Sequence, residues 1–70
     1  MDRRSILVES KREMNLLLSE FNGKNYREVY ALINGVLSFF VNKYPTLELQ
    51  FNVAFESCIK QLKKMQREGI

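Results

Sequence analysis

The sequence contains no histidine, one cysteine and one proline among its 70 residues, and these shortages exclude several kinds of site. A lone Cys58 forms no disulfide within one chain, and a structural zinc site needs four nitrogen or sulfur ligands. Cys58 also has no candidate base beside it and falls on an apolar stripe, which is typical of a core thiol. The serines lack a nucleophile motif, and the three glycines are too isolated to form a phosphate-binding loop. We therefore expect no enzymatic activity, no metal and no cofactor.

Long hydrophobic runs are also missing. The uncharged stretch 29–41 is the most apolar part of the chain, but a membrane-spanning helix needs roughly 20 apolar residues. The apolar run 6–8 is too short for a secretory signal. Together with the single cysteine, these features predict a protein without membrane contact in a reducing, cytoplasmic setting.

Apolar residues recur at helical spacing in three segments, about 3–21, 26–43 and 47–67. This pattern predicts one all-α domain, 1–70, built as a small three-helix bundle. The middle segment is apolar over at least half of its circumference, which places it at the centre of the assembly. The other two segments carry narrower stripes, which consist of Leu7, Met14, Leu17, Leu18 and Phe21 in the first, and of Leu47, Phe51, Ala54, Phe55, Cys58, Ile59, Leu62 and Met65 in the third.

The predicted helices are bounded by residues that favour helix ends. The pair 22–23 is Asn-Gly, and glycine suits the left-handed conformation just beyond a helix. Asn25 with Glu28 resembles a capping box for the second helix. Pro45 disfavours helix at the residue before it, so the second helix should end near residue 43, and Thr46 can cap the third.

One alternative places strands in the second half of the chain. Apolar and polar residues alternate over 47–53, which is the period of a strand. If Asn34-Gly35 ended a shorter helix, segments 36–41 and 47–53 could pair as a hairpin. The helical interpretation is preferred because the apolar stripe of the third segment continues unbroken to Met65.

A chain of this length also suggests oligomerisation. A single small core rarely yields more than about 3–5 kcal/mol, and disulfides and zinc are already excluded. The second and third helices carry four apolar residues, Leu32, Phe39, Leu49 and Val53, beyond those that a one-sided core needs. Gly35 either permits close approach of another helix or simply faces solvent. We expect a homodimer through the second and third helices, or a groove for a partner helix, unless the bundle covers its middle helix more completely. The predicted protein-interface residues are Leu32, Gly35, Phe39, Leu49 and Val53.

The net charge is only +3, but basic residues gather on the outer face of the last helix. They could contact phosphates of a nucleic acid, or they could complement the helix dipole and keep the surface soluble. The predicted function is a small non-enzymatic regulatory or adaptor protein acting by protein contact and self-association, of a kind common on phages and mobile elements. The alternative is a dimeric nucleic-acid-binding regulator that uses Lys60, Lys63, Lys64 and Arg67.

Overall fold

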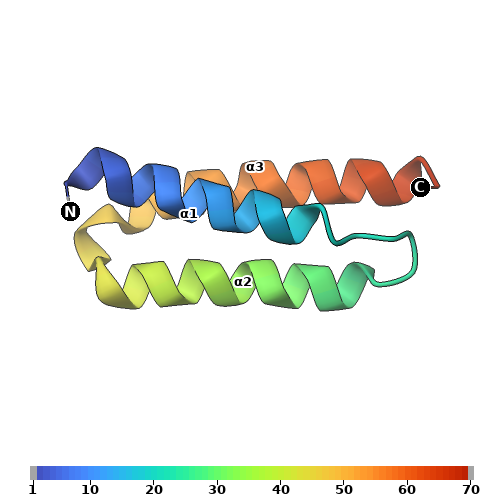
Figure 1. Cartoon of the computed structure of the whole chain (residues 1–70), viewed down its shortest axis with the longest axis horizontal. Coiled ribbons are helices and arrows are strands. Elements are labelled where there is room, and N and C mark those ends of the chain that lie inside the picture. The colour runs from blue at the N-terminus through green and yellow to red at the C-terminus, as the bar shows by residue number, and fades with distance from the viewer. Residues whose placement is uncertain (1, 70) are drawn as a thin grey trace.

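The computed structural model describes residues 2–69 as a three-helix bundle, which confirms the predicted all-α fold (Figure 1). The helices are α1 (Arg3–Leu18), α2 (Tyr26–Lys43) and α3 (Glu48–Arg67), and a 3₁₀ turn, η1 (Pro45–Leu47), precedes α3. They run up, down and up, and each helix packs against the other two. Met1 and Ile70, which the predicted domain includes, lie outside the described residues.

One side of each helix faces the axis of the bundle, and the buried side chains form two connected regions. The smaller region lies toward the α2–α3 turn and consists of Ile6, Phe40, Leu47 and Phe51. The larger region fills the rest of the bundle and consists of Met14, Phe21, Val29, Ile33, Ala54, Cys58, Ile59 and Leu62.

The first helix begins and ends through local backbone chemistry. The backbone N–H of Ser5 donates to the Asp2 carboxylate over 2.8 Å, which caps α1 and lowers the pKa of Asp2. The helix ends at Leu18, three residues earlier than predicted, although Phe21 still packs into the core. Gly23 has φ of 90°, but it lies five residues beyond Leu18, so this left-handed glycine belongs to the loop and does not end α1 as predicted.

The prediction that Asn25 caps the second helix through its side chain is wrong. Asn25 occupies the position before α2, but its side chain makes no bond to the first turn of that helix. Instead its Oδ1 accepts from the backbone N–H of Asn22, and its Nδ2 donates to the carbonyl of Glu20. The Asn25 side chain thus forms hydrogen bonds with backbone groups of the loop after α1. It is therefore not available to cap the first turn of α2.

Thr46 likewise does not cap the third helix. It lies inside η1, and Leu47 is the residue that precedes α3, without a side-chain cap. Pro45 fixes the first position of η1, where its missing N–H costs nothing. The tight turn therefore replaces the predicted cap.

The hairpin alternative is wrong, because residues 2–69 contain no strand and both segments concerned are helical. The alternation over 47–53 comes from two pairs of apolar residues. The members of each pair are four residues apart, and the two pairs lie on opposite sides of one helical segment. Leu47 and Phe51 are buried, whereas Leu49 and Val53 face outward. A helix with apolar residues on two opposite sides therefore shows the alternating sequence pattern of a strand over its first two turns.

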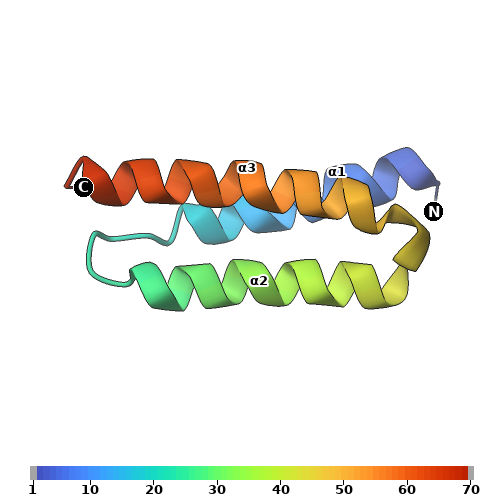
Figure 2. The same cartoon turned by 180° about the vertical axis from the view of Figure 1, so that it is seen from behind.

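The bundle is a short rod with Cα extents of 38 × 17 × 16 Å. Seen from both sides, the described chain starts beside the α2–α3 turn and ends beside the α1–α2 loop (Figure 2). Among the described residues, no helix combines the length and apolarity that crossing a membrane requires.

Candidate protein-interaction surfaces

The outer groove between α1 and α3 is the first candidate surface. Leu49 and Val53 are 74% and 63% exposed, and they lie along this groove with Leu7, Lys11 and Gln50. The groove is shallow, open and mostly apolar, with a volume of about 270 Å³. Its lining comes from two helices rather than from a loop, so its shape is fixed by the packing of α1 against α3.

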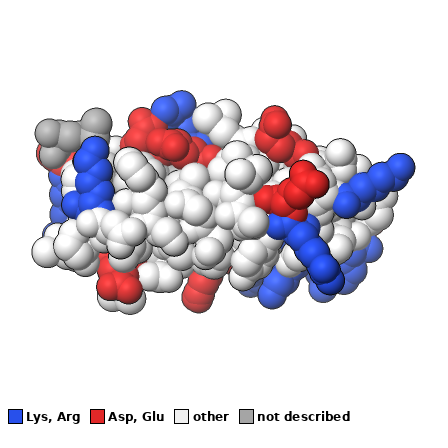
Figure 3. Space-filling view, turned by 90° about the horizontal axis from the view of Figure 1, so that it is seen from below, with Lys and Arg blue, Asp and Glu red and all other residues white. Residues whose placement is uncertain are grey.

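The outer face of α2 is the second candidate surface. Leu32 and Phe39 are 53% and 57% exposed there, one turn on either side of Gly35. Figure 3, which looks onto the α2 side of the bundle, shows a broad uncharged band with charged side chains toward its edges. This band follows from the sequence, since no residue from 29 to 41 carries a charge.

The two surfaces lie on different sides of the bundle. Tyr30 marks the side of α2 that faces α3, because its ring meets the ring of Phe55 edge-on at 5.9 Å. At about 100° per residue, Leu32 and Phe39 lie roughly 160° and 180° away from Tyr30 around the helix. They therefore adjoin α1 rather than α3. The structure pairs Leu49 with Val53, and Leu32 with Phe39, but it does not unite the four residues on one α2–α3 face.

Gly35 faces open space. A methyl group placed on its Cα would meet no atom within 4 Å, so the packing of this chain does not require a glycine. Of the two sequence interpretations, close approach to α1 or α3 is thereby removed. What is left is a solvent-facing glycine, or close approach by a second molecule.

Val8 and Leu16 are exposed apolar residues that the sequence interpretation did not assign. They are 57% and 55% exposed on α1. Leu16 is nine residues from Leu7, so it lies about 180° around α1 from the α3 groove and toward α2. The predicted stripe of α1 was centred on the wrong side chains. The buried residues of this helix are Ile6, Ser10 and Met14, and a stripe centred on them turns Val8 and Leu16 outward.

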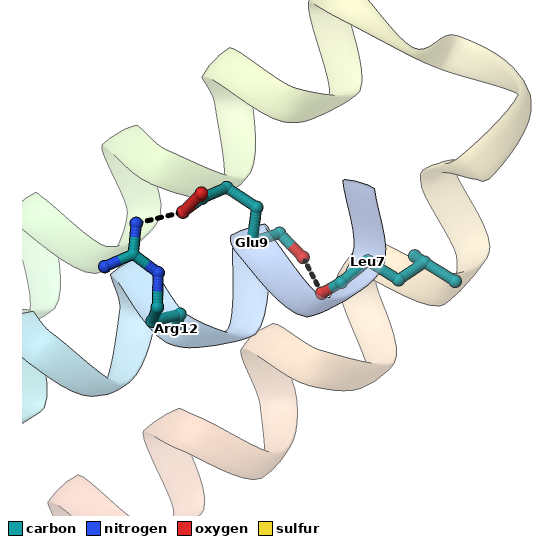
Figure 4. Close-up of polar contacts among 4 residues, drawn as sticks. Leu7, Glu9 and Arg12 are labelled. Atoms are coloured by element: carbon teal, nitrogen blue, oxygen red, sulfur yellow. Dashed lines mark hydrogen bonds and ion pairs between the residues drawn. The ribbon is translucent and has the colours of Figure 1, made fainter. Parts of the chain in front are cut away.

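Charged groups on α1 form one ion pair between Arg12 and Glu9, shown in Figure 4. It is the only ion pair found within residues 2–69. The predicted basic residues on α3 are all exposed and have no carboxylate within ion-pair distance in that range, which leaves their charges available to an anionic partner. These residues are Lys60, Lys63, Lys64 and Arg67.

Cys58 lies in the core, where its thiol donates to the carbonyl oxygen of Met14 over 3.6 Å. Burial raises the pKa of this thiol, which disfavours the reactive thiolate. Among residues 2–69, no group of three or more histidine, cysteine or acidic side chains is arranged to hold a metal ion.

Models of known families, curated proteins and solved structures give no match to this chain.

Proposed function

We propose that this chain is a small non-enzymatic regulatory or adaptor protein that acts through helix-mediated contact with other proteins and through self-association. The observation that supports the proposal is the exposure of Leu32 and Phe39 on one side of the bundle, and of Leu49 and Val53 on another. A buried, free thiol at Cys58 is consistent with a reducing, cytoplasmic setting.

The free energies of burying apolar side chains favour binding to another protein over an isolated monomer. Burying one Leu, Val or Phe side chain stabilises by about 1.5–3 kcal/mol. The whole core of a chain this small contributes only about 3–5 kcal/mol net. A partner that covered two or three of the exposed side chains would therefore add an amount comparable to the folding free energy.

The test replaces Leu49 and Val53 with aspartate in one double variant. Solution mass is measured by sedimentation over a dilution series, and protein partners bound to the tagged chain are identified by mass spectrometry. We expect the double variant to lose self-association, partner capture or both. Val8→Asp is compared with each single variant, Leu49→Asp and Val53→Asp, because it adds the same one charge at a similarly exposed residue outside the groove. If neither this double variant nor Leu32→Asp, which changes the α2 surface, loses self-association or partner capture, the proposal fails.

The second candidate is a dimeric nucleic-acid-binding regulator, supported by the exposed and unpaired basic side chains of α3. Each phosphate contact would add about 0.9 to the slope of log affinity against log salt for duplex DNA. Retention on DNA should therefore fall steeply with salt and disappear when Lys60, Lys63, Lys64 and Arg67 are all changed to glutamine. A variant with Arg3, Arg4, Lys11 and Arg12 changed to glutamine has the same net charge and serves as control. No retention at low salt would remove this candidate.

A further inference from the structure

One stripe of α2 combines opposite charges at its ends with apolar residues between them. Glu28, Leu32, Gly35, Phe39 and Lys43 follow one another at spacings of four, three, four and four residues, so they share one side of the helix. All five are exposed. Neither Glu28 nor Lys43 makes an ion pair within residues 2–69, and the Lys43 Nζ lies 5.6 Å from the centre of the Phe39 ring.

The stripe has a symmetry that matters for a second copy. Leu32 and Phe39 lie at equal distances along the sequence on either side of the peptide between Gly35 and Val36. Glu28 and Lys43 are also equidistant from that point. A two-fold axis through this peptide would set Leu32 of each copy against Phe39 of the other, and Glu28 of each copy against Lys43 of the other.

We propose that α2 packs antiparallel against α2 of a second copy of this chain, about a two-fold axis at Gly35. The inference rests on the self-association in the proposed function and names its surface and geometry. A two-fold contact uses the same patch on both subunits, so the patch must complement itself. The antiparallel arrangement meets this condition at both its apolar and its charged positions.

The charges select this direction over the parallel one. In a parallel pair, Glu28 would face Glu28 and Lys43 would face Lys43, and like charges across an interface are repulsive. In the antiparallel pair, each end of the contact carries one attractive pair. The direction of packing therefore follows from the order of the two charges along α2.

Gly35 lies beside the two-fold axis of this dimer, where the two α2 backbones come closest. The distance between packed helices depends on the side chains at the contact, and it reaches about 8 Å only where these are small. Gly35 leaves open space that no atom of its own chain fills. A second backbone can approach there while Leu32 and Phe39 interlock on each side.

The expected dimer is reversible. Helix α2 has 18 residues and is about 27 Å long, so one stripe of it covers less than the roughly 800 Å² per partner of a standard interface. We expect sedimentation to show a monomer–dimer equilibrium with a Kd between about 1 µM and 1 mM, as is usual for small interfaces.

Charge reversal tests the geometry. Glu28→Lys alone and Lys43→Glu alone each place like charges at both ends of the antiparallel contact, and each should weaken the dimer about tenfold or more. The double variant Glu28→Lys/Lys43→Glu restores opposite charges at both ends and should return association close to that of the unmodified chain. Leu32→Asp should remove the dimer over the whole concentration range.

Circular dichroism of each variant checks that the helices remain. If a charge-reversed variant loses helix, Glu28→Gln and Lys43→Gln replace it, and each should weaken association to a lesser degree. The proposal is overturned if the unmodified chain stays monomeric, if Leu32→Asp still dimerises, or if the double variant is no stronger than the two single ones. If only Leu49→Asp/Val53→Asp abolishes association, the α2 dimer is wrong while the proposed function stands.

Discussion

The thiol of Cys58 on α3 lies 3.6 Å from the carbonyl oxygen of Met14 on α1, inside the contact between the two helices. The two residues are 44 positions apart in sequence, so this contact exists only in the folded bundle. Its thiol is shielded and its pKa is raised by burial.

Cys58 should therefore react slowly with thiol reagents in the native protein. Only opened molecules expose the thiolate, so we expect alkylation near pH 8 to be at least about 100-fold slower than in denaturant. Mass spectrometry of quenched samples measures the two rates. Equal rates would show that the thiol is accessible in the folded state.

The same burial predicts weaker folding in alkaline solution. A thiol with a raised pKa in the folded state keeps its full contribution below the ordinary value, and loses it as pH rises through the folded value. Urea midpoints should thus fall above about pH 8.5, the ordinary pKa of cysteine, and fall less in Cys58→Ala. An identical alkaline decline in both proteins would contradict the assignment to this thiol.

Phe51 and Phe39 carry the same side chain in opposite environments. Phe51 is fully buried with its ring 5.4 Å from that of Phe40, whereas Phe39 is 57% exposed. Phe51→Ala should cost about 3–5 kcal/mol, which is the whole stability expected of such a core. Phe39→Ala should cost the monomer less than about 1 kcal/mol. Urea unfolding at low protein concentration compares them, and similar losses would contradict the packing.

Gly35→Ala should stabilise the monomer. Alanine has open space at this position and lies in a helix interior, where it is favoured over glycine by about 0.5–1 kcal/mol. Chemical unfolding of the variant at low concentration measures the gain. A loss of stability instead would show that the Gly35 backbone has a close neighbour.

Ser10 is buried where α1 meets the other helices, and its hydroxyl donates to the Leu7 carbonyl over 2.8 Å. That bond stays within one helical turn, so Ser10→Ala should change stability little or raise it by a few tenths of a kcal/mol, about the difference in helix propensity. Ser10→Leu should cost about 1–3 kcal/mol, because it adds two heavy atoms at a position that is completely buried. Thermal unfolding of the pair separates the two effects.

Much of the fold follows from helical spacing in the sequence, including the helix count and the end of α2 at Lys43. The helix ends that depend on loop geometry do not. Asn25 binds the loop before it rather than the helix after it, and Pro45 builds a 3₁₀ turn that takes the place of a Thr46 cap. Such competition between local hydrogen bonds is settled by the tertiary path of the chain.

The predicted interface residues are exposed, but their grouping could not be obtained from separate helical wheels. Leu32 and Leu49 point away from the core on their own helices, and a wheel does not show which neighbour each outward direction adjoins. The contact of Tyr30 with Phe55 fixes that relation and separates the two surfaces. Whether these surfaces bind protein, and whether α3 binds nucleic acid, stay predictions.

An odd number of antiparallel helices has a mechanical consequence. The described chain enters at one end of a 38 Å rod and leaves at the other. Tension applied through these two ends would slide α1 and α3 past each other along their length, so many side-chain contacts would have to yield together rather than one turn at a time. The bundle should therefore resist stretching better than a helical hairpin of equal stability.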